Sequence, residues 1–345
     1  MLALTACGGG NSNSSSSSGG GGAASGKVGV ILPDTTSSPR WESQDRPKLE
    51  SAFKAAGVKY DIQNAQNDAQ KMQTIAQQMI TGGVTVLAIV NLDNASGAAI
   101  EKQAKQQGVQ TIDYDRLTLG GSADYYVSYD NTKVGKLQGE GLHKCLGDKP
   151  ASIAYLNGSP DDNNATLFSN GAHSVLDKVG SYTKVAEQAV PKWDAVQAQT
   201  IFEQMYTQAG GNIQGLYAAN DTLANAAIQT IKRNNQQIPV TGQDAAVVGL
   251  QNILAGDQCM TVWKPADGEA KALSDTAIAL LKGDKPDTTG TAKDPEGNRD
   301  VPSILLDPIS VTKDNLADVI GKGAQAATAV CTGEFAAMCA TVGIK

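Results

Sequence analysis

Residues that commonly build catalytic or metal sites are scarce in this sequence. It contains two histidines, His143 and His173, in 345 residues, and its five cysteines include no Cys-x-x-Cys pair. A structural zinc site needs about four such ligands at short spacings, so we expect no metal site. The sequence has no Gly-x-Ser-x-Gly motif, and no glycine-rich phosphate loop follows a predicted strand. The sequence therefore predicts neither a cofactor nor a catalytic residue.

An excess of basic residues is also missing. The chain has 28 Lys and Arg against 35 Asp and Glu, which gives a formal net charge of −7 at pH 7. Nucleic-acid binding depends on a basic face, so we expect no nucleic-acid partner. No apolar run approaches the roughly 18 residues that a membrane-spanning helix needs. The length of 345 residues suits two domains rather than one.

The first 26 residues have a distinct composition. Leu4, Thr5 and Ala6 place small and apolar residues directly before Cys7, and a Gly/Ser-rich tract follows. This arrangement resembles the lipobox of bacterial lipoproteins, in which the cysteine carries the lipid. We expect Cys7 to anchor the protein to the outer face of the cell membrane, with residues 1–26 comprising the lipobox remnant and the Gly/Ser tether. The alternative is a chance cysteine in a low-complexity segment.

Four further cysteines, Cys145, Cys259, Cys331 and Cys339, form an even set. Outside the cytoplasm an even number of cysteines favours disulfides, and four cysteines allow three pairings. Cys331 and Cys339 flank the short turn CTGEFAAMC, so they are the favoured pair, and Cys145 with Cys259 would follow. Buried free thiols are the alternative.

From residue 27 onward, short β-type runs alternate with amphipathic helices. The strand candidates are 27–32, 58–63, 84–90, 109–115, 151–158, 183–190, 213–220, 238–244 and 259–264. Between them apolar residues recur at helical spacing, as at Met72, Ile75 and Met79. This alternation predicts an α/β protein with two doubly wound, Rossmann-like parallel sheets. The pattern restarts near 128–135, and a late lone helix, 267–284, must pack on one of the sheets.

Polar and aromatic side chains follow nearly every predicted strand. Ligands of open α/β sheets bind beyond the carboxyl ends of the strands, so these side chains are candidates for one site. The candidates are Arg40, Trp41, Asp115, Arg116, Asn164, Trp193, Asn220, Asp244 and Lys264. Carboxylates accept hydrogen bonds, Arg and Lys donate, Asn does both, and aromatic rings cover apolar faces. A sugar ring, with many hydroxyls and two C–H faces, suits this set.

Several of these residues also have a structural interpretation. Asp115 and Arg116 could form an ion pair with each other. We expect Asp221 to be only a helix cap, and Asp162 to shape a loop and cap a helix rather than touch a ligand. Acidic pairs also occur in glycosidases, but carboxylates spread over many strand ends favour hydroxyl recognition over one tuned catalytic pair.

Several short motifs, in this order, resemble one protein family. They are PRW at 39–41, DYDR at 113–116, YVSYDNTKVG at 126–135, GSPDDNNATLF at 158–168, AND at 219–221, TGQDA at 241–245, MTVWKP at 260–265 and DVPSILLDPISVTKDN at 300–315. From about Lys27 to about Ile320 the chain resembles the periplasmic-binding-protein-type sugar receptors of bacterial ABC importers, and among them the D-xylose-binding and multiple-sugar-binding members. The matching positions imply sugar contacts from the nine residues named above.

The resemblance also implies an architecture and a mechanism. It implies a type I periplasmic-binding-protein clamshell whose two lobes are joined by a three-segment hinge near 129–131, 263–266 and 306–309. The lobes would be 27–129 plus 266–306 and 130–265 plus 307–345. A monosaccharide, with D-xylose favoured, would close the hinge, and the closed monomer would meet an ABC permease. The stretch QAVPKW at 188–193 departs from the family where an aromatic residue is expected before Trp193.

Three other functions are alternatives to a D-xylose receptor. A glucose or broad aldose receptor, with or without a role in chemosensing, would use the same fold and site. The effector domain of a sugar-responsive repressor would need an N-terminal helix-turn-helix, where this chain has the Gly/Ser tract. A sugar-acting enzyme would need a poised base or a metal cluster, which the sequence does not indicate.

Overall fold

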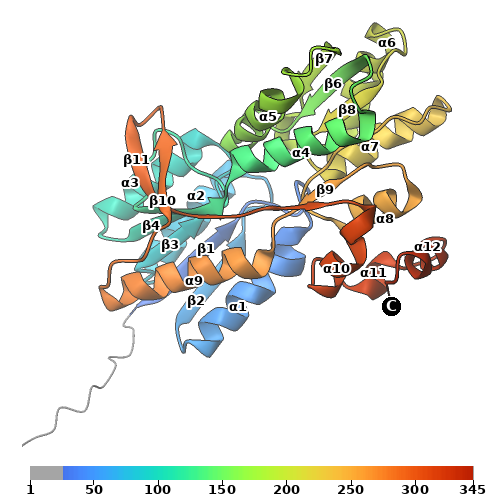
Figure 1. The fold of residues 1–345 in the computed structure, drawn as a ribbon. Helices are drawn as coiled ribbons and strands as arrows, with labels where there is room; N and C mark the ends of the chain where they lie inside the picture. The colour runs from blue at the N-terminus through green and yellow to red at the C-terminus, as the bar shows by residue number, and fades with distance from the viewer. Residues whose placement is uncertain (1–25, 345) are drawn as a thin grey trace, which may run out of the picture.

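The computed structural model describes residues 26–344 and shows α/β architecture (Figure 1). The expected anchor Cys7 and nearly all of the expected tether lie outside the described residues. Among the described residues, none of the helices combines the length and the apolarity needed to cross a membrane.

One part of the molecule is built on a seven-stranded sheet. Its strands are β1 (Lys27–Leu32), β2 (Lys59–Asn64), β3 (Val86–Ile89), β4 (Gln110–Tyr114), β5 (Tyr125–Tyr129), β10 (Gly290–Asp294) and β11 (Arg299–Leu306). Their order is β10-β11-β5-β4-β3-β1-β2, and neighbouring strands are parallel except in the β10–β11 hairpin. The parallel arrangement predicted from the sequence is confirmed here.

Helices cover both faces of this sheet. They are α1 (Arg46–Ala55), α2 (Ala69–Thr81), α3 (Asn94–Gln106) and α9 (Ala266–Lys282), with a short π-helical turn at Trp41–Asp45. On one face Phe53 of α1 and Leu273 of α9 pack in one core cluster. On the other face Met72 of α2 and Ile100 of α3 pack in a second cluster. The late lone helix is therefore α9, and it packs on the first sheet as Figure 1 shows.

The other part is built on a smaller sheet of three parallel strands, β7-β6-β8. These strands are β6 (Ala151–Asn157), β7 (Tyr182–Ala189) and β8 (Gly215–Ala218). Its helices are α4 (Asn131–Leu146), α5 (Asn163–Leu176), α6 (Ala195–Gln208), α7 (Asp221–Arg233) and α8 (Val247–Ala255), with a 3₁₀ turn at Pro191–Trp193. Large buried side chains from these elements, such as Phe168, Phe202 and Tyr217, share one core.

The strand predictions for the second sheet were partly wrong. Residues 238–244 form no strand, and only Val240 makes a single bridge to Leu216 of β8. Residues 259–264 yield β9 (Thr261–Trp263), which pairs antiparallel with β12 (Ile309–Val311) in a separate two-stranded sheet. The sequence reading also missed β5, β10, β11 and β12. β5 and β12 pair with β11 and β9, which are distant in sequence, so local alternation was a weak signal for them, whereas β10 and β11 form a local hairpin.

The chain passes three times between the two parts. It leaves the seven-stranded sheet after β5 at Asp130, returns after β9 through Pro265 into α9, and leaves again after β11 at Asp307. In Figure 1 these passages run side by side through the middle of the molecule.

The C-terminal segment packs against α8. It comprises a 3₁₀ turn (Lys313–Asn315), α10 (Leu316–Gly321), α11 (Ala327–Val330) and α12 (Phe335–Thr341). Leu250 of α8 shares a small core with Leu316 of α10 and Val330 of α11. A disulfide between Cys331 and Cys339 closes the loop between α11 and α12. The C-terminal segment is thus a disulfide-closed extension that packs on the second part.

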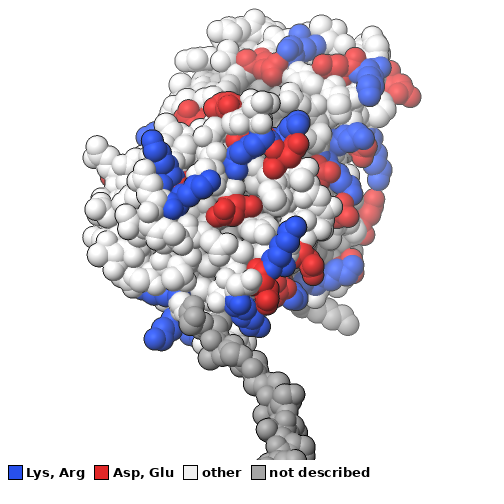
Figure 2. Space-filling view, turned by 90° about the vertical axis from the view of Figure 1, so that its left-hand side faces the viewer, with Lys and Arg blue, Asp and Glu red and all other residues white. Residues whose placement is uncertain are grey.

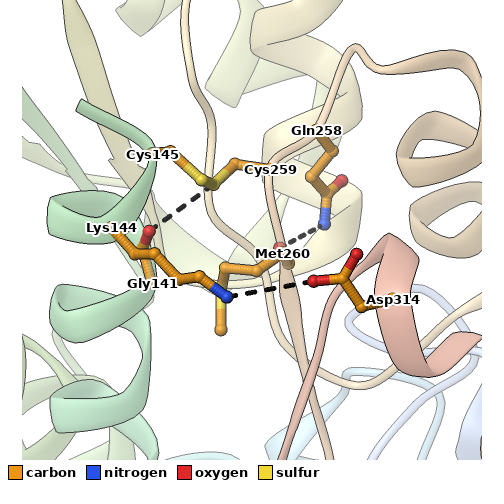
Figure 3. The surroundings of a disulfide bond; sticks show 7 residues. All are labelled: Gly141, Lys144, Cys145, Gln258, Cys259, Met260 and Asp314. Atoms are coloured by element: carbon orange, nitrogen blue, oxygen red, sulfur yellow. Dashed lines mark hydrogen bonds and ion pairs between the residues drawn. A yellow bond between two sulfur atoms is a disulfide. The ribbon is translucent and has the colours of Figure 1, made fainter. Parts of the chain in front are cut away.

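A second disulfide joins Cys145 in the last turn of α4 to Cys259 just before β9 (Figure 3). Beside it, the Nζ of Lys144 lies 3.9 Å from Oδ2 of Asp314. The bond therefore ties the helix that follows the first passage to the strand that precedes the second. Both disulfides have the pairing that the sequence favoured.

Charged residues are interspersed on the face of the molecule drawn in Figure 2. Lys and Arg side chains there lie next to Asp and Glu side chains, and no broad area carries one sign. This face offers no basic surface of the kind that a nucleic-acid backbone requires.

Candidate functional site

The first wall of the site consists of Arg40, Trp41, Asp115 and Arg116. Arg40 and Trp41 follow β1, and Asp115 and Arg116 follow β4, so both pairs come from carboxyl ends of strands in the seven-stranded sheet. All four side chains are buried. The switch from strand to loop at these ends positions the four groups at one edge of the sheet.

Arg40 is held by three carboxylates. Its Nε and Nη2 donate to the two oxygens of Asp45 at 2.8 and 2.7 Å, and Nη2 also donates to Glu269 of α9. Its Nη1 donates to Oδ2 of Asp115 at 3.1 Å. Burial by itself would lower the pKa of Arg40, but Asp45 and Glu269 outweigh burial and raise it well above its usual value. The guanidinium is therefore charged and fixed in direction.

Glu269 is the carboxyl of this group whose burial is least compensated. It is fully buried, and its Oε1 has no hydrogen-bond partner. Burial raises the pKa of Glu269 to about 8, although Arg40 lies against it. Tyr114 completes the group, because its hydroxyl donates to Asp45 at 2.6 Å.

The indole ring of Trp41 lies close to two cations. The guanidinium carbon of Arg40 is 4.6 Å from the centre of the indole ring, and that of Arg116 is 5.8 Å from it. Such distances allow cation–π attraction. The indole Nε1 donates to Oγ of Ser37 at 3.2 Å. The ring is therefore fixed both by its edge and by the charges beside it.

Asp115 and Arg116 do not pair with each other, which contradicts the structural alternative considered for them. Arg116 places its Nε 2.9 Å from Oδ2 of Asp162, and its Nη1 donates to the carbonyl of Asn91 at 3.1 Å. Asp115 instead contacts Arg40 and lies 3.6 Å from the Nζ of Lys264.

The Asp115 carboxyl is ionised in these surroundings. Burial alone would raise its pKa, but the nearby cations, Lys264 first and then Arg40, outweigh burial and hold the pKa below its usual value. An ionised carboxylate only accepts hydrogen bonds, so Asp115 offers acceptor positions to a ligand.

The second wall consists of Asn164, Trp193, Asn220 and Asp244. Asn164 lies in the first turn of α5, and its Nδ2 donates to the carbonyl of Asp115 at 2.9 Å. Trp193 ends the 3₁₀ turn after β7, and its Nε1 donates to Oδ2 of Asp162 at 3.1 Å. The second wall thus contacts the first directly, and the structure is closed.

The expected cap of α7 was assigned to the wrong residue. Asn220, not Asp221, is the N-cap, because its Oδ1 accepts from the amide of Leu223 at 2.9 Å. The Nδ2 of Asn220 still reaches across to the carbonyl of Ser37 at 3.2 Å. Asp221 is buried below the site, where it accepts hydrogen bonds from Gln258 and Thr261.

Three of the nine candidates have left-handed backbone. The φ angles are +62° at Asp115, +56° at Trp193 and +98° at Asp244. Residues with a Cβ rarely adopt this region, and such strain occurs preferentially at functional sites. At each position the chain turns sharply at the site, so the side chain is directed by the turn.

Lys264 joins the two walls from the second passage of the chain. Its Nζ lies 3.6 Å from Oδ2 of Asp115 and 3.7 Å from Oδ1 of Asp244. It also lies 5.6 Å from the ring centre of Phe168. A single ammonium group therefore bridges carboxylates of both walls.

All nine predicted residues line one cavity. Five further residues line it: Ser37, Ser38, Asp162, Phe168 and Gln243. Two of these had a usable signal in the sequence, because Gln243 ends a predicted strand region and Phe168 follows Asn164 by one helical turn. Glu269 had none, since α9 is far away in sequence from the elements it meets.

The chemistry of this cavity is recognition of a polar small molecule. Carboxylates, cations, amides and two indole rings line it. Within residues 26–344 no group of three or more His, Cys, Asp or Glu side chains is arranged to hold a metal ion. The arrangement suits a ligand with several hydroxyls.

Known sugar-binding proteins are similar to this chain in sequence. The chain is 33% identical to the D-xylose-binding periplasmic protein of Escherichia coli over 86% of its own length and 89% of that protein. It is also 33% identical to the multiple sugar-binding periplasmic receptor ChvE of Rhizobium radiobacter, over 86% of its length and 90% of that protein.

Among solved structures, a solute binding protein of an ABC transporter from Clostridium phytofermentans, with bound β-D-glucose, superposes with a TM-score of 0.82. It is 28% identical, and the match covers 88% of this chain and 99% of that one. The family model described as periplasmic binding protein domain matches residues 28–285. The chain belongs to the periplasmic binding protein domain family and has its type I α/β fold.

Proposed function

We propose that this protein is an extracytoplasmic receptor that captures a monosaccharide by hinge closure and delivers it to an ABC permease. One observation carries the proposal: side chains from both parts of the molecule and from the passage between them line one polar cavity. Hydroxyl groups donate and accept, so they match a wall of carboxylates, guanidinium groups and amides. The two indole rings, of Trp41 and Trp193, suit the C–H faces of a sugar ring.

D-Xylose is the proposed substrate. The support comes from the relatives named D-xylose-binding periplasmic protein, at 33% and 32% identity. D-Glucose is the second candidate, because solved structures at 28% and 29% identity contain bound glucose. The two sugars differ by one hydroxymethyl group, which changes affinity by roughly 1–3 kcal/mol in a close-fitting pocket.

The proposed motion is closure of two lobes, 27–129 plus 266–306 and 130–265 plus 307–345. The three chain passages near 130, 265 and 307 would act as the hinge, because backbone rotations at a few residues can move whole lobes. Contacts such as Asn220 Nδ2 to the Ser37 carbonyl, at 3.2 Å, would form only on closing. A sugar that touches both walls stabilises the closed form by the free energy of those contacts.

We also propose that the receptor is a monomer held at the membrane by a lipid on Cys7. The support is the sequence itself, in which small residues precede Cys7 and a Gly/Ser tract follows it. Partition of the expressed protein into a detergent phase tests the anchor. Wild type should enter the detergent phase and Cys7→Ser should remain in the aqueous phase, whereas equal partition would contradict it.

Calorimetric titration with xylose, glucose, arabinose, ribose and galactose tests the sugar proposal. We expect D-xylose to bind with a Kd of about 1–100 μM, which corresponds to roughly −8 to −5.5 kcal/mol. Binding of glucose without xylose would replace the substrate, and failure of every sugar would overturn the proposal. Recovery of the bound sugar unchanged after incubation is expected, since a receptor binds without conversion.

A further inference from the structure

Asp162 makes contacts beyond those of a helix cap. Its Oδ1 accepts from the amide of Asn164 at 2.9 Å, which is the capping bond of α5. Its Oδ2 accepts from Nε1 of Trp193 at 3.1 Å and also lies 2.9 Å from Nε of Arg116. One carboxylate therefore holds a residue of each wall.

The contact with Arg116 crosses between the two parts of the molecule. Arg116 follows β4 of the seven-stranded sheet, whereas Asp162 precedes α5 beside the three-stranded sheet. The side chains of both residues are more than nine-tenths buried. Removing one partner of a buried ion pair leaves the other charge without compensation, so the pair favours the arrangement in which it is formed.

The pair also lies between two cavities. The inner cavity is the one lined by the nine candidate residues, and an outer cavity adjoins it. Ser37, Arg116, Asp162 and Trp193 line both, and the outer cavity is also lined by charged residues such as Asp93 and Lys192. The four shared residues therefore form the partition between the inner cavity and the outer one.

Arg116 has further contacts that fix the pair in position. Nη1 donates to the carbonyl of Asn91 at 3.1 Å, and Nη2 lies 3.5 Å from Oγ of Ser37. The Nε contact with Asp162 is an ion pair and not an aligned hydrogen bond. Burial raises the pKa of Asp162, and the charge of Arg116 opposes that rise. The attraction is thus largely electrostatic and does not require a strict angle.

We infer that Arg116 and Asp162 form a latch that shuts the inner cavity behind the bound sugar, with Asp162 as a positioning residue that acts through Arg116. The inference rests on the proposed function. The latch forms only after the walls meet, so it slows escape of the ligand and leaves its entry unchanged. Asp162 thereby sets the lifetime of the closed complex.

The test is stopped-flow Trp fluorescence on wild type and Asp162→Asn with the tightest-binding sugar of the panel. Asn keeps an oxygen for the cap of α5, but it has no charge for Arg116 and no second acceptor for Trp193. We expect the dissociation rate to rise at least tenfold and the association rate to stay within twofold. A dissociation rate within twofold of wild type would overturn the latch.

Asp194→Asn is the matched control. Asp194 caps α6 as Asp162 caps α5, accepting from the amides of Val196 and Gln197 at 2.8 and 2.9 Å, but it is exposed. We expect both rate constants of this variant to stay within twofold of wild type. An equal acceleration in both variants would mean that lost capping is the cause, and it would overturn the latch.

A double variant tests whether Asp162 acts through Arg116. If it does, Arg116→Gln with Asp162→Asn should dissociate within threefold of Arg116→Gln alone. Multiplied effects of the two changes would overturn the assignment. If wild type binds sugar and Asp162→Asn releases it at the wild-type rate, only the latch is overturned. If wild type binds no sugar, both the latch and the proposed function are overturned.

Discussion

The two walls of the cavity are held in place by different means. In the first wall, Arg40 is fixed by the buried carboxylates of Asp45 and Glu269. In the second wall, Asn220 is fixed by its capping bond and Asp244 by a left-handed turn. Both disulfides also belong to the second part. Buried charge therefore supports the first wall at Arg40, whereas a cap and a turn support the second wall at Asn220 and Asp244, in the part of the molecule that holds both disulfides.

This difference predicts different consequences of mutation. A buried charge that loses its partner destabilises the whole fold, so changes behind the first wall should impair stability and binding together. A lost cap costs about 1 kcal/mol, so changes in the second wall should impair binding while the protein stays folded. Measuring both the free energy of unfolding and the sugar affinity, for matched variants of the two walls, tests this contrast.

The largest effect should come from the covalent support of the second part. Cys145→Ser with Cys259→Ser opens a loop with a sequence separation of 114 residues. The chain-entropy model gives a loss of about 4–5 kcal/mol in the free energy of unfolding. Urea denaturation measures it.

The pair Cys331→Ser with Cys339→Ser is the control, because that bond spans a sequence separation of only 8 residues. The same model gives a loss of about 2–3 kcal/mol for so short a loop. A larger loss from the C-terminal pair than from Cys145 and Cys259 would show that loop length does not govern the stabilisation.

The next effect should come from the charges behind the first wall. Asp45→Asn removes the bidentate partner of Arg40 and leaves a buried guanidinium short of negative charge. We expect a loss of about 4 kcal/mol in the free energy of unfolding, together with weaker sugar binding. Chemical denaturation and calorimetry measure the two quantities on the same sample.

Glu50→Gln is the control for this change. Glu50 pairs with Lys54 on the surface of α1, with an Nζ–Oε2 distance of 3.7 Å. Surface pairs contribute roughly 0–1 kcal/mol, so stability and affinity should hardly change. Equal losses from Asp45→Asn and Glu50→Gln would contradict the idea that buried charge maintains the first wall.

The sequence predicted the candidate site better than the elements around it. Side chains at strand ends can be read locally, because the strand that precedes each one is short and apolar, as for Trp41 after β1. Strand pairing cannot be read this way: residues 238–244 look like a strand, yet they make only the bridge from Val240 to Leu216. Their neighbours in space, not their own pattern, decide the outcome.

The residues that support the site were harder to predict than those that line it. Glu269 meets Arg40 across 229 positions of sequence, and nothing in the local pattern of α9 marks it. Asp221 was interpreted as a cap because it begins a helix, but Asn220 one residue earlier makes that bond. Both side chains are buried, so their hydrogen-bond partners separate the two roles, and these partners depend on the packing of α7 against the rest of the second part.

Asp221 gives the second part a measurable pH dependence. Burial raises the pKa of its carboxyl to about 7, although Gln258 and Thr261 donate to it. In the unfolded chain the carboxyl loses its proton near pH 4. Between about pH 4 and pH 7 the folded protein therefore retains a proton that the unfolded chain has released, so its contribution to stability falls as pH rises.

Asp221→Asn removes this titration. We expect the difference in unfolding free energy between wild type and Asp221→Asn to change by about 3 kcal/mol from pH 4 to pH 7, to the disadvantage of wild type. Urea denaturation across that range measures it. A difference that is constant with pH would show that Asp221 is ionised in the folded protein throughout, and that its charge is compensated by the hydrogen bonds it accepts.

The smallest effect in energy compares one residue from each wall. Trp41→Ala removes an indole face that is 3% exposed, and Asp244→Ala removes a carboxylate 3.7 Å from the Nζ of Lys264. Each change should lower sugar affinity at least tenfold, about 1.4 kcal/mol or more, without unfolding the protein. Calorimetry measures the affinity, and circular dichroism checks the fold.

The two variants separate contributions that one variant alone would mix. If both walls touch the sugar, neither wall can compensate for the other, and both variants lose affinity. Loss with Trp41→Ala alone would mean that the second wall only encloses the ligand while the first binds it. Unchanged affinity in both would place the sugar outside this cavity, because a ligand inside it cannot avoid a buried indole on one side and a buried carboxylate on the other.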